Sequence, residues 1–298
     1  MLHIKYKFVF IALLLGLIFA NPASAEINVV TTIKPLHSIV STIMLGAGKP
    51  ALLMRSAVSP HDYKLKPSDI RALHRADIIF WIGPALESRL SKPIRQIKKS
   101  AAIVELLKSK EVKIYGIRGK NNDQHHDKID PHIWLSLHNA LVIAEIAWRK
   151  LALLDSKNAK LYSSNFQKYD QTLERLRNKI SEDLELAGKT PYIVQHDAFQ
   201  YFEKENELKN LGSIMASPEH RPGAKRVSTI RKLIKTQSIA CVFGEPQYSQ
   251  KLLRTVTAKS SVRIAILDSV GVNLEPGPDL YLKLMRNLAA SFKSCLQD

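Results

Sequence analysis

Short runs of β-branched and apolar residues alternate with longer helix-like segments, and this alternation occurs twice along the chain. The strand-like runs are 27–33, 52–54, 77–82 and 103–106 in the first half, and 192–194, 211–214, 240–243 and 263–267 in the second. Helical patterns lie between the first runs, at 36–45, 67–75 and 85–98. Strands that alternate with helices form βαβ units around a parallel sheet. We therefore predict an α/β protein with two lobes, each a parallel β-sheet flanked by helices.

A long polar, helix-favouring stretch, 155–186, separates the two halves. Apolar side chains recur along it at roughly helical spacing: Leu161, Phe166, Tyr169, Leu173, Leu176 and Ile180. If it is one continuous helix, its 32 residues measure about 48 Å, and Gly188 and Pro191 would end it. The predicted organisation is an N-terminal lobe, 26–154, one long linking helix within 155–187, and a C-terminal lobe, 188–298.

The first 25 residues have the pattern of a cleaved signal peptide. Lys5 and Lys7 precede an apolar run, 8–20, and the small residues Ala23-Ser24-Ala25 follow it. The run has 13 residues, which is short for a helix that spans a bilayer. No cysteine directly follows it that could carry a lipid. We expect a soluble product that is exported, most simply to a bacterial periplasm.

Basic residues outnumber acidic ones by 17 in the whole chain, and by 15 once Lys5 and Lys7 leave with the signal peptide. Such a balance can indicate binding to nucleic acid or to an anionic membrane surface. Here the basic residues are spread through helical segments such as 89–99 and 226–235, without interleaved aromatic residues or a recognition motif. We interpret them as solvated helix faces and expect no nucleic-acid partner.

Cys241 and Cys295 are the two cysteines of the chain. In an oxidising compartment a disulfide between them is the economical interpretation, and two buried thiols are the alternative. The disulfide would tie the run 240–243 to the last helix, and the chain-entropy model gives such a closed loop about 4 kcal/mol of stabilisation.

Three histidines lie in short turn-like segments, each with an aspartate beside or near it: Ser59-Pro60-His61-Asp62, Asp130-Pro131-His132 and Gln195-His196-Asp197. Neutral imidazole is a common metal ligand, and a nearby carboxylate can hold the ring and fix its tautomer. His61 and His196 follow strand-like runs, Asp268 follows the run 263–267, and His132 lies on a loop before a helix. Because parallel sheets bind ligands beyond the carboxyl ends of their strands, we expect these residues to meet in one cleft between the lobes.

Three imidazoles and one carboxylate make a four-coordinate set that suits zinc. Manganese and iron(II) are usually offered more oxygen ligands, whereas affinity order alone would also admit copper and nickel. Water in place of Asp268 is the alternative for the fourth position. The short polar tract around His125 and His126 could collect metal weakly or be an ordinary solvated loop, and both interpretations stay open.

A series of short motifs then gives a resemblance that covers essentially the whole mature chain. In order, these are Thr31-Thr32-Ile33-Lys34-Pro35-Leu36, Ser59-Pro60-His61-Asp62-Tyr63, Lys66-Pro67-Ser68-Asp69, Ala76-Asp77-Ile78-Ile79, Gly83-Pro84, Asp130-Pro131-His132-Ile133-Trp134-Leu135-Ser136, Gln195-His196-Asp197-Ala198-Phe199, Gly244-Glu245-Pro246-Gln247 and Leu267-Asp268. In this order they resemble the cluster A-I metal-binding proteins of ABC transporters, and most closely the zinc-binding members. That family also has two α/β lobes joined by one long helix.

The resemblance implies that His61, His132 and His196 are the three histidine ligands, and that Asp268 is the acid that supplies a fourth ligand in several relatives. Manganese-binding relatives commonly have glutamate where His196 stands, so zinc is favoured. Cys241 and Cys295 match the positions of a disulfide in zinc-binding members. Two departures are visible: Pro60 replaces the acid that precedes the first ligand in some members, and the His-rich loop is reduced to 123–130.

The predicted function is that of a periplasmic binding protein, a monomer that captures zinc and delivers it to the membrane permease of an ABC transporter. A manganese- or iron-binding homologue of the same transporter class is one alternative. A zinc-dependent hydrolase is another, because three protein ligands and a water also form a catalytic site, with Glu245 as the first candidate for a general base. No His-Glu-x-x-His run supports that alternative. A surface adhesin is disfavoured by the missing lipidation cysteine.

Overall fold

The computed structural model describes residues 26–97, 101–118, 129–215 and 222–297 of the chain. The predicted signal peptide, 1–25, and the His125-His126 tract lie outside the described residues. Within the part of the chain that the structure describes, there is no helix with the length and apolar character needed to cross a membrane.

Two four-stranded parallel sheets form the centres of the two lobes. The first has the order β2-β1-β3-β4, with strands Ala51–Leu52, Val29–Thr31, Ile78–Trp81 and Ala102–Glu105. The second has the order β6-β5-β7-β8, with strands Asn210–Ser213, Tyr192–Val194, Cys241–Gly244 and Arg263–Ile266. Both central pairs, β1 with β3 and β5 with β7, are buried along their whole length. This explains their unbroken apolar sequences, since helices cover both faces of such sheets. All eight predicted strands are confirmed to within about two residues at each end.

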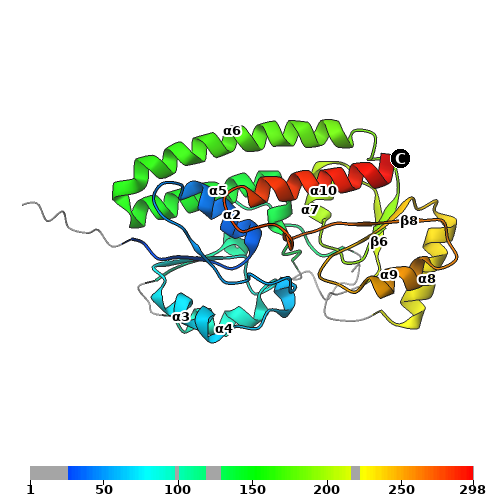
Figure 1. Ribbon diagram of the computed structural model, residues 1–298, viewed down its shortest axis with the longest axis horizontal. Coiled ribbons are helices and arrows are strands. Elements are labelled where there is room, and N and C mark those ends of the chain that lie inside the picture. Colours follow the sequence, from blue (N-terminus) through cyan, green and yellow to red (C-terminus); the bar gives the residue numbers. More distant parts are fainter. Residues whose placement is uncertain (1–25, 98–100, 119–128, 216–221, 298) are drawn as a thin grey trace, which may run out of the picture.

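Helices cover each sheet on two sides, as Figure 1 shows. Helices α3 (Pro67–Arg75) and α4 (Ser91–Arg95) lie on one side of the first lobe, and α8 (Ala224–Thr236) and α9 (Gln250–Thr257) lie on the corresponding side of the second. Helices α2 (Lys34–Ile43), α5 (Leu137–Leu154), α6 (Ala159–Leu184) and α10 (Leu280–Gln297) form the opposite layer. The short α7 (Gln200–Glu205) completes the second lobe. The predicted α/β class is thereby confirmed.

The long helix is α6, which follows one 3-10 turn at Ser156–Asn158. Its 26 residues give a length of about 39 Å, and it lies along α5 and α10 at the top of Figure 1. Tyr169, Leu173 and Ile180 are on its buried face, in agreement with the predicted apolar spacing. Helix α10 packs against α2 as well as α6, so the last helix returns to the first lobe. The residue boundaries assigned to the lobes stay predictions.

The helix predicted over 85–98 is wrong in its extent. The chain instead forms a turn after Gly83, a 3-10 turn at Ser88–Leu90 and the five-residue helix α4. Pro93 lacks a backbone N–H and is tolerated only in the first turn of a helix. A helix that contains Pro93 therefore has to begin close before it, as α4 does at Ser91.

A disulfide joins Cys241 of β7 to Cys295 of α10. The predicted pairing is confirmed. Because α10 also packs on α2 and α6, this bond fixes the second sheet to the helical layer that runs across both lobes.

Candidate metal centre

His61, His132 and His196 come together between the two lobes. Each offers a ring nitrogen that lies within 4.8 Å of the other two, and among the described residues no other histidine, cysteine or carboxylate belongs to this group. The ring centroids are 5.4, 5.6 and 4.9 Å apart, and the Nε2 atoms of His61 and His132 are 3.3 Å apart. The expectation that these distant loops meet at one place is thus met.

Each histidine lies within or close to a short element of secondary structure. His61 is in the 3-10 turn Pro60–Asp62, beyond β2, and the Asp62 N–H donates to the Ser59 carbonyl at 3.0 Å to close that turn. His132 directly precedes the 3-10 turn Ile133–Leu135, and His196 is the second residue after β5. His132 and His196 are 4 % and 5 % exposed, whereas His61 is partly exposed. His61 is therefore the ligand candidate nearest to solvent.

Asp130 holds His132 in place, as the paired motif predicts. One oxygen of Asp130, Oδ1, lies 2.7 Å from the ring Nδ1 of His132 and accepts its backbone N–H at 3.1 Å. Burial would raise the pKa of Asp130, but its contacts with His132 and Gln200 outweigh burial and lower it. An ionised Asp130 assigns the proton of the ring to Nδ1, which leaves the Nε2 lone pair free to bind a cation.

His196 is held by Glu245 and not by its neighbour Asp197, so the predicted pairing is wrong at this site. The ring Nδ1 of His196 lies 3.0 Å from Glu245 Oε1. The other oxygen of Glu245 accepts hydrogen bonds from Ser269 Oγ at 2.6 Å and from Gln247 Nε2 at 2.8 Å. Asp197 instead pairs with Arg118. Asp62, the third aspartate of the motif, is exposed.

The missed role of Glu245 has a structural reason. Strand β7 lies beside β5, with Phe243 opposite Val194, so the residues that follow these two strands emerge side by side at the same edge. In the sequence, the one indication of this role was that Glu245 closely follows the predicted strand 240–243. That β7 lies beside β5, which brings Glu245 to His196, is decided by the fold.

The surroundings shift the pKa values of two rings in opposite directions. Burial, together with the His132 and His196 rings, lowers the pKa of His61 to about 2, so this ring is neutral. Burial also acts to lower the pKa of His196, but the Glu245 carboxylate outweighs it and raises the pKa. Two of the three imidazoles thus have a carboxylate behind them, Asp130 at His132 and Glu245 at His196, as at metal sites with carboxylate-supported histidines.

Asp268 is the second residue after β8, close to the predicted position, but the structure gives its carboxylate other partners. It accepts the backbone N–H groups of Val270 at 3.1 Å, Gly271 at 2.8 Å and Val272 at 2.6 Å. The chain turns sharply after β8, and these N–H groups bind the nearest anion. Asp268 is not part of the group formed by the three ring nitrogens. Its role as a ligand stays a prediction.

The space between the rings is small. The cavity there has a volume of about 10 Å³, and Leu86, Trp134 and Tyr248 are among the residues that line it with the three histidines. That is about the room one water molecule needs. Two much larger cavities, of about 970 and 910 Å³, include none of the three histidines. The site therefore fits a single ion better than an organic molecule.

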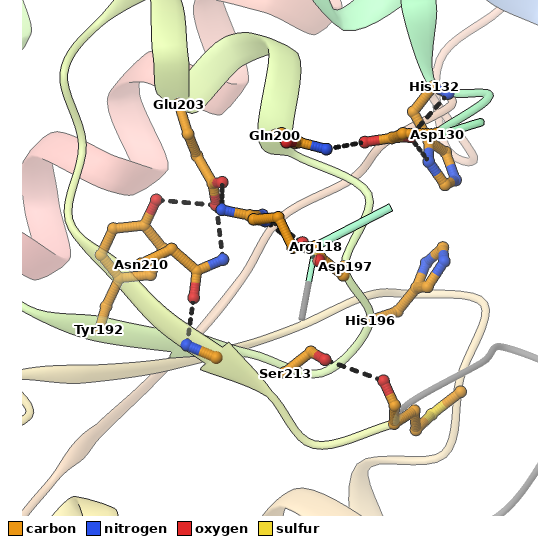
Figure 2. Close-up of polar contacts among 12 residues, drawn as sticks. Arg118, Asp130, His132, Tyr192, His196, Asp197, Gln200, Glu203, Asn210 and Ser213 are labelled. Carbon is orange, nitrogen blue, oxygen red and sulfur yellow. Dashed lines mark hydrogen bonds and ion pairs between the residues drawn. The ribbon is translucent and has the colours of Figure 1, made fainter. Parts of the chain in front are cut away.

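Helix α7 connects two of the three histidines. Gln200 donates to Asp130 Oδ2 at 2.9 Å, and the Tyr201 hydroxyl donates to the Asp130 carbonyl at 2.7 Å. The same helix starts four residues after His196. Figure 2 shows Gln200 reaching toward Asp130, which in turn contacts His132. His132, which precedes the long helix in sequence, is thereby fastened to the second lobe.

Comparisons with known proteins agree with this fold and give the family of the chain. A family model described as "ZnuA: Zinc-uptake complex component A periplasmic" matches residues 29–295. The high-affinity zinc uptake system protein ZnuA of Brucella abortus is 36% identical over 321 residues, which cover 96% of each chain. The periplasmic zinc binding protein TroA from Treponema pallidum has the same fold, with a TM-score of 0.79 and 21% identity over 91% of this chain and 99% of that one. So does the SBP FpvC from Pseudomonas aeruginosa, solved in complex with Mn2+, with a TM-score of 0.81 and 19% identity over 92% and 99%. The chain therefore belongs to the ZnuA family of periplasmic zinc-uptake components.

Proposed function

We propose that this protein captures one zinc ion between its lobes, with His61, His132 and His196 as ligands, and delivers it to the permease of an ABC transporter. The observation that carries the proposal is the convergence of three ring nitrogens within 4.8 Å of one another. Carboxylates behind His132 and His196 direct the free nitrogen of each ring toward the ion.

The choice of zinc rests on the donor set. Three imidazoles suit zinc, whereas manganese and iron(II) prefer more oxygen. The fold alone does not select the metal, because proteins with this fold include one solved with Mn2+ and one named for zinc. The relative from Brucella abortus, which is named for zinc uptake, supports the same choice. A manganese- or iron-binding protein is the second candidate, and it would require Asp268 or another oxygen donor to join the site.

For the fourth position we propose a water molecule in competition with Asp268. To reach the ion, the Asp268 carboxylate would have to give up its bonds to the N–H groups of Val270, Gly271 and Val272. An Asp268→Asn variant distinguishes the two. With water as the ligand its zinc dissociation constant stays close to that of the wild type, and with Asp268 as the ligand it rises.

We further propose that the site does not act as a hydrolase. The cavity of about 10 Å³ leaves no room for an organic substrate beside the ion. Glu245, the first candidate for a general base, is engaged with His196 and with Ser269. We also propose that the protein is exported through a signal peptide in 1–25, is a monomer and has no nucleic-acid partner. The proposed N-terminal lobe ends at 154 and the proposed C-terminal lobe begins at 188.

The direct test is a zinc titration of the purified protein and of its variants. The wild type is expected to bind one zinc ion, and the triple variant His61→Ala, His132→Ala, His196→Ala is expected to lose this binding. His74→Ala is the matched control, because His74 lies exposed on α3. Circular dichroism checks that each variant is folded. The single variant His61→Ala, at the most accessible ligand, is expected to raise the zinc dissociation constant less than the triple variant does. Zinc binding by the triple variant with wild-type affinity would refute the proposed site.

Competition between zinc and manganese tests the choice of metal. A tighter dissociation constant for zinc is expected from the histidine ligands. Preference for manganese would favour the second candidate.

A further inference from the structure

Arg118 lies between two carboxylates of the second lobe. Its Nε donates to Asp197 Oδ2 at 3.1 Å, and its Nη2 pairs with the other oxygen of the same carboxylate. Its Nη1 lies 2.6 Å from Glu203 Oε2. Figure 2 shows the guanidinium in this position. Because the planar guanidinium has a fixed set of donors, such two-pronged pairing sets the orientation as well as the distance of its partners.

Glu203, in α7, holds Arg118 firmly because its buried carboxylate cannot turn toward water. Its side chain is 2 % exposed, and its second oxygen accepts hydrogen bonds from the Tyr192 hydroxyl at 2.9 Å and from Asn210 Nδ2 at 2.8 Å. Removing one partner of a buried ion pair leaves an uncompensated charge. The position of Arg118 is therefore tightly constrained by α7 and β5.

The two carboxylates relate Arg118 to His196. Asp197 is the next residue after His196, and Glu203 is on the helix that begins four residues after His196. Arg118 thus holds one carboxylate in the turn between β5 and α7 and one carboxylate in α7 itself.

The chain around Arg118 also leads to His132. Gly116 pairs with Ile129 in an antiparallel bridge, and the Asp130 N–H donates to the Tyr115 carbonyl at 2.9 Å. Asp130 in turn holds the His132 ring. The segment that carries Arg118 is thus the partner of the segment that carries His132, and Gln200 of α7 also donates to the Gly116 carbonyl at 3.0 Å.

We propose that Arg118 is a positioning residue for metal binding: its pairs with Asp197 and Glu203 lock the His196 turn against the segment that holds His132 and so set the spacing of these two ligands. Arg118 does not contact the ion. The inference rests on the proposed function and adds a residue that the resemblance and the histidine motifs do not include.

The physical reason for an effect on affinity is the narrow tolerance of metal coordination. Zinc–nitrogen distances vary by only about 0.2 Å, so a small drift of one segment relative to the other weakens a bond to the ion. Outer partners of metal ligands typically change affinity by about 10- to 100-fold when they are replaced. We expect the lower end of this range, because Asp130 and Glu245 still hold the two rings.

The test compares two changes at Arg118 with a matched surface control. The variant Arg118→Met, Glu203→Gln removes the ion pairs and leaves no charge on the buried residue 203, while Asp197, which also loses its partner, has a side chain that is 25% exposed. The amide oxygen of Gln can still accept from Tyr192 and Asn210. Arg118→Lys keeps the charge but cannot form the two-pronged pair. The control is Arg149→Met, because Arg149 also pairs with two carboxylates, Glu145 and Glu111, but is 53% exposed.

Zinc dissociation constants are measured by competition with a chromophoric chelator, dissociation rates by stopped flow, and melting temperatures of the zinc-free proteins by circular dichroism. The double variant is expected to bind about tenfold more weakly and to release zinc correspondingly faster, with Arg118→Lys in between and Arg149→Met within about twofold of wild type. A purely structural role would lower the melting temperature and leave zinc binding and release unchanged. That result would overturn the proposal, and if the double variant does not fold, unchanged zinc binding by Arg118→Lys would do so. Failure of the wild type to bind zinc would instead refute the proposed function.

Discussion

Glu87 gives the protein a pH-dependent stability whose size follows from its burial. Its side chain is 1 % exposed, and one carboxylate oxygen accepts the Gly83 N–H at 2.9 Å. Burial raises the pKa of Glu87 from its ordinary value of 4.5 to about 7, against the N–H groups and the Thr32 hydroxyl, which favour the ionised form. Three other buried carboxylates, Asp130, Glu203 and Glu245, have a histidine or arginine partner. Glu87 lacks such a partner among the groups that shift its pKa.

The sign of the effect follows from proton linkage. Between pH 4.5 and about 7 the native protein keeps a proton on Glu87 that the unfolded chain has already lost. The free energy of unfolding therefore falls as the pH rises through this window. Below pH 4.5 the contribution is fully present. A shift of about two and a half pKa units, at 1.36 kcal/mol per unit, amounts to about 3 kcal/mol.

The variant Glu87→Gln removes the ionisation and keeps an oxygen that can accept the Gly83 N–H. Relative to wild type, it is expected to gain about 3 kcal/mol of stability between about pH 4.5 and about pH 8. The assay is urea unfolding of the zinc-free proteins across this range, with the difference in unfolding free energy plotted against pH. Glu182→Gln, on the exposed side of α6, controls for the loss of one carboxylate. A difference between Glu87→Gln and wild type that does not vary with pH would refute the reasoning.

Three further predictions concern the site and the disulfide. Glu245→Gln should weaken zinc binding about tenfold, because it removes the charge that supports His196, and an unchanged dissociation constant in a chelator competition would count against this support. Burial acts to lower the pKa of His196, but Glu245 outweighs it and raises the pKa above the ordinary value of 6.5. Zinc affinity should therefore fall as the pH is lowered, with the fall beginning above pH 6.5, because a protonated ring cannot bind; calorimetry at several pH values checks this, and a pH-independent affinity would contradict histidine ligation. Replacing Cys241 and Cys295 with serine should cost up to about 4 kcal/mol for a loop of this length, seen as an earlier urea midpoint, and equal midpoints for the variant and the oxidised wild type would exclude a stabilising role for the bond.

The sequence alone indicated the strands, the long helix and the three histidines. Strand and helix patterns depend on neighbouring residues, so the eight strands and the long α6 follow from local periodicity. The rule that parallel sheets bind ligands beyond their strand ends indicated one cleft for His61 and His196, and the position of His132 on a loop added it to that group. A pair of cysteines in a chain that was predicted to be exported made a disulfide the economical prediction, and the structure contains it.

The partners of those histidines were decided only by the tertiary structure. Proximity in sequence suggested Asp197 for His196, but the position of β7 beside β5 brings Glu245 to that ring, and Arg118 takes Asp197. The turn after β8 likewise engages Asp268 with its own backbone. Which carboxylate reaches which ring depends on strand order and on contacts between residues about 50 to 80 positions apart, and a local pattern holds no information about such distances.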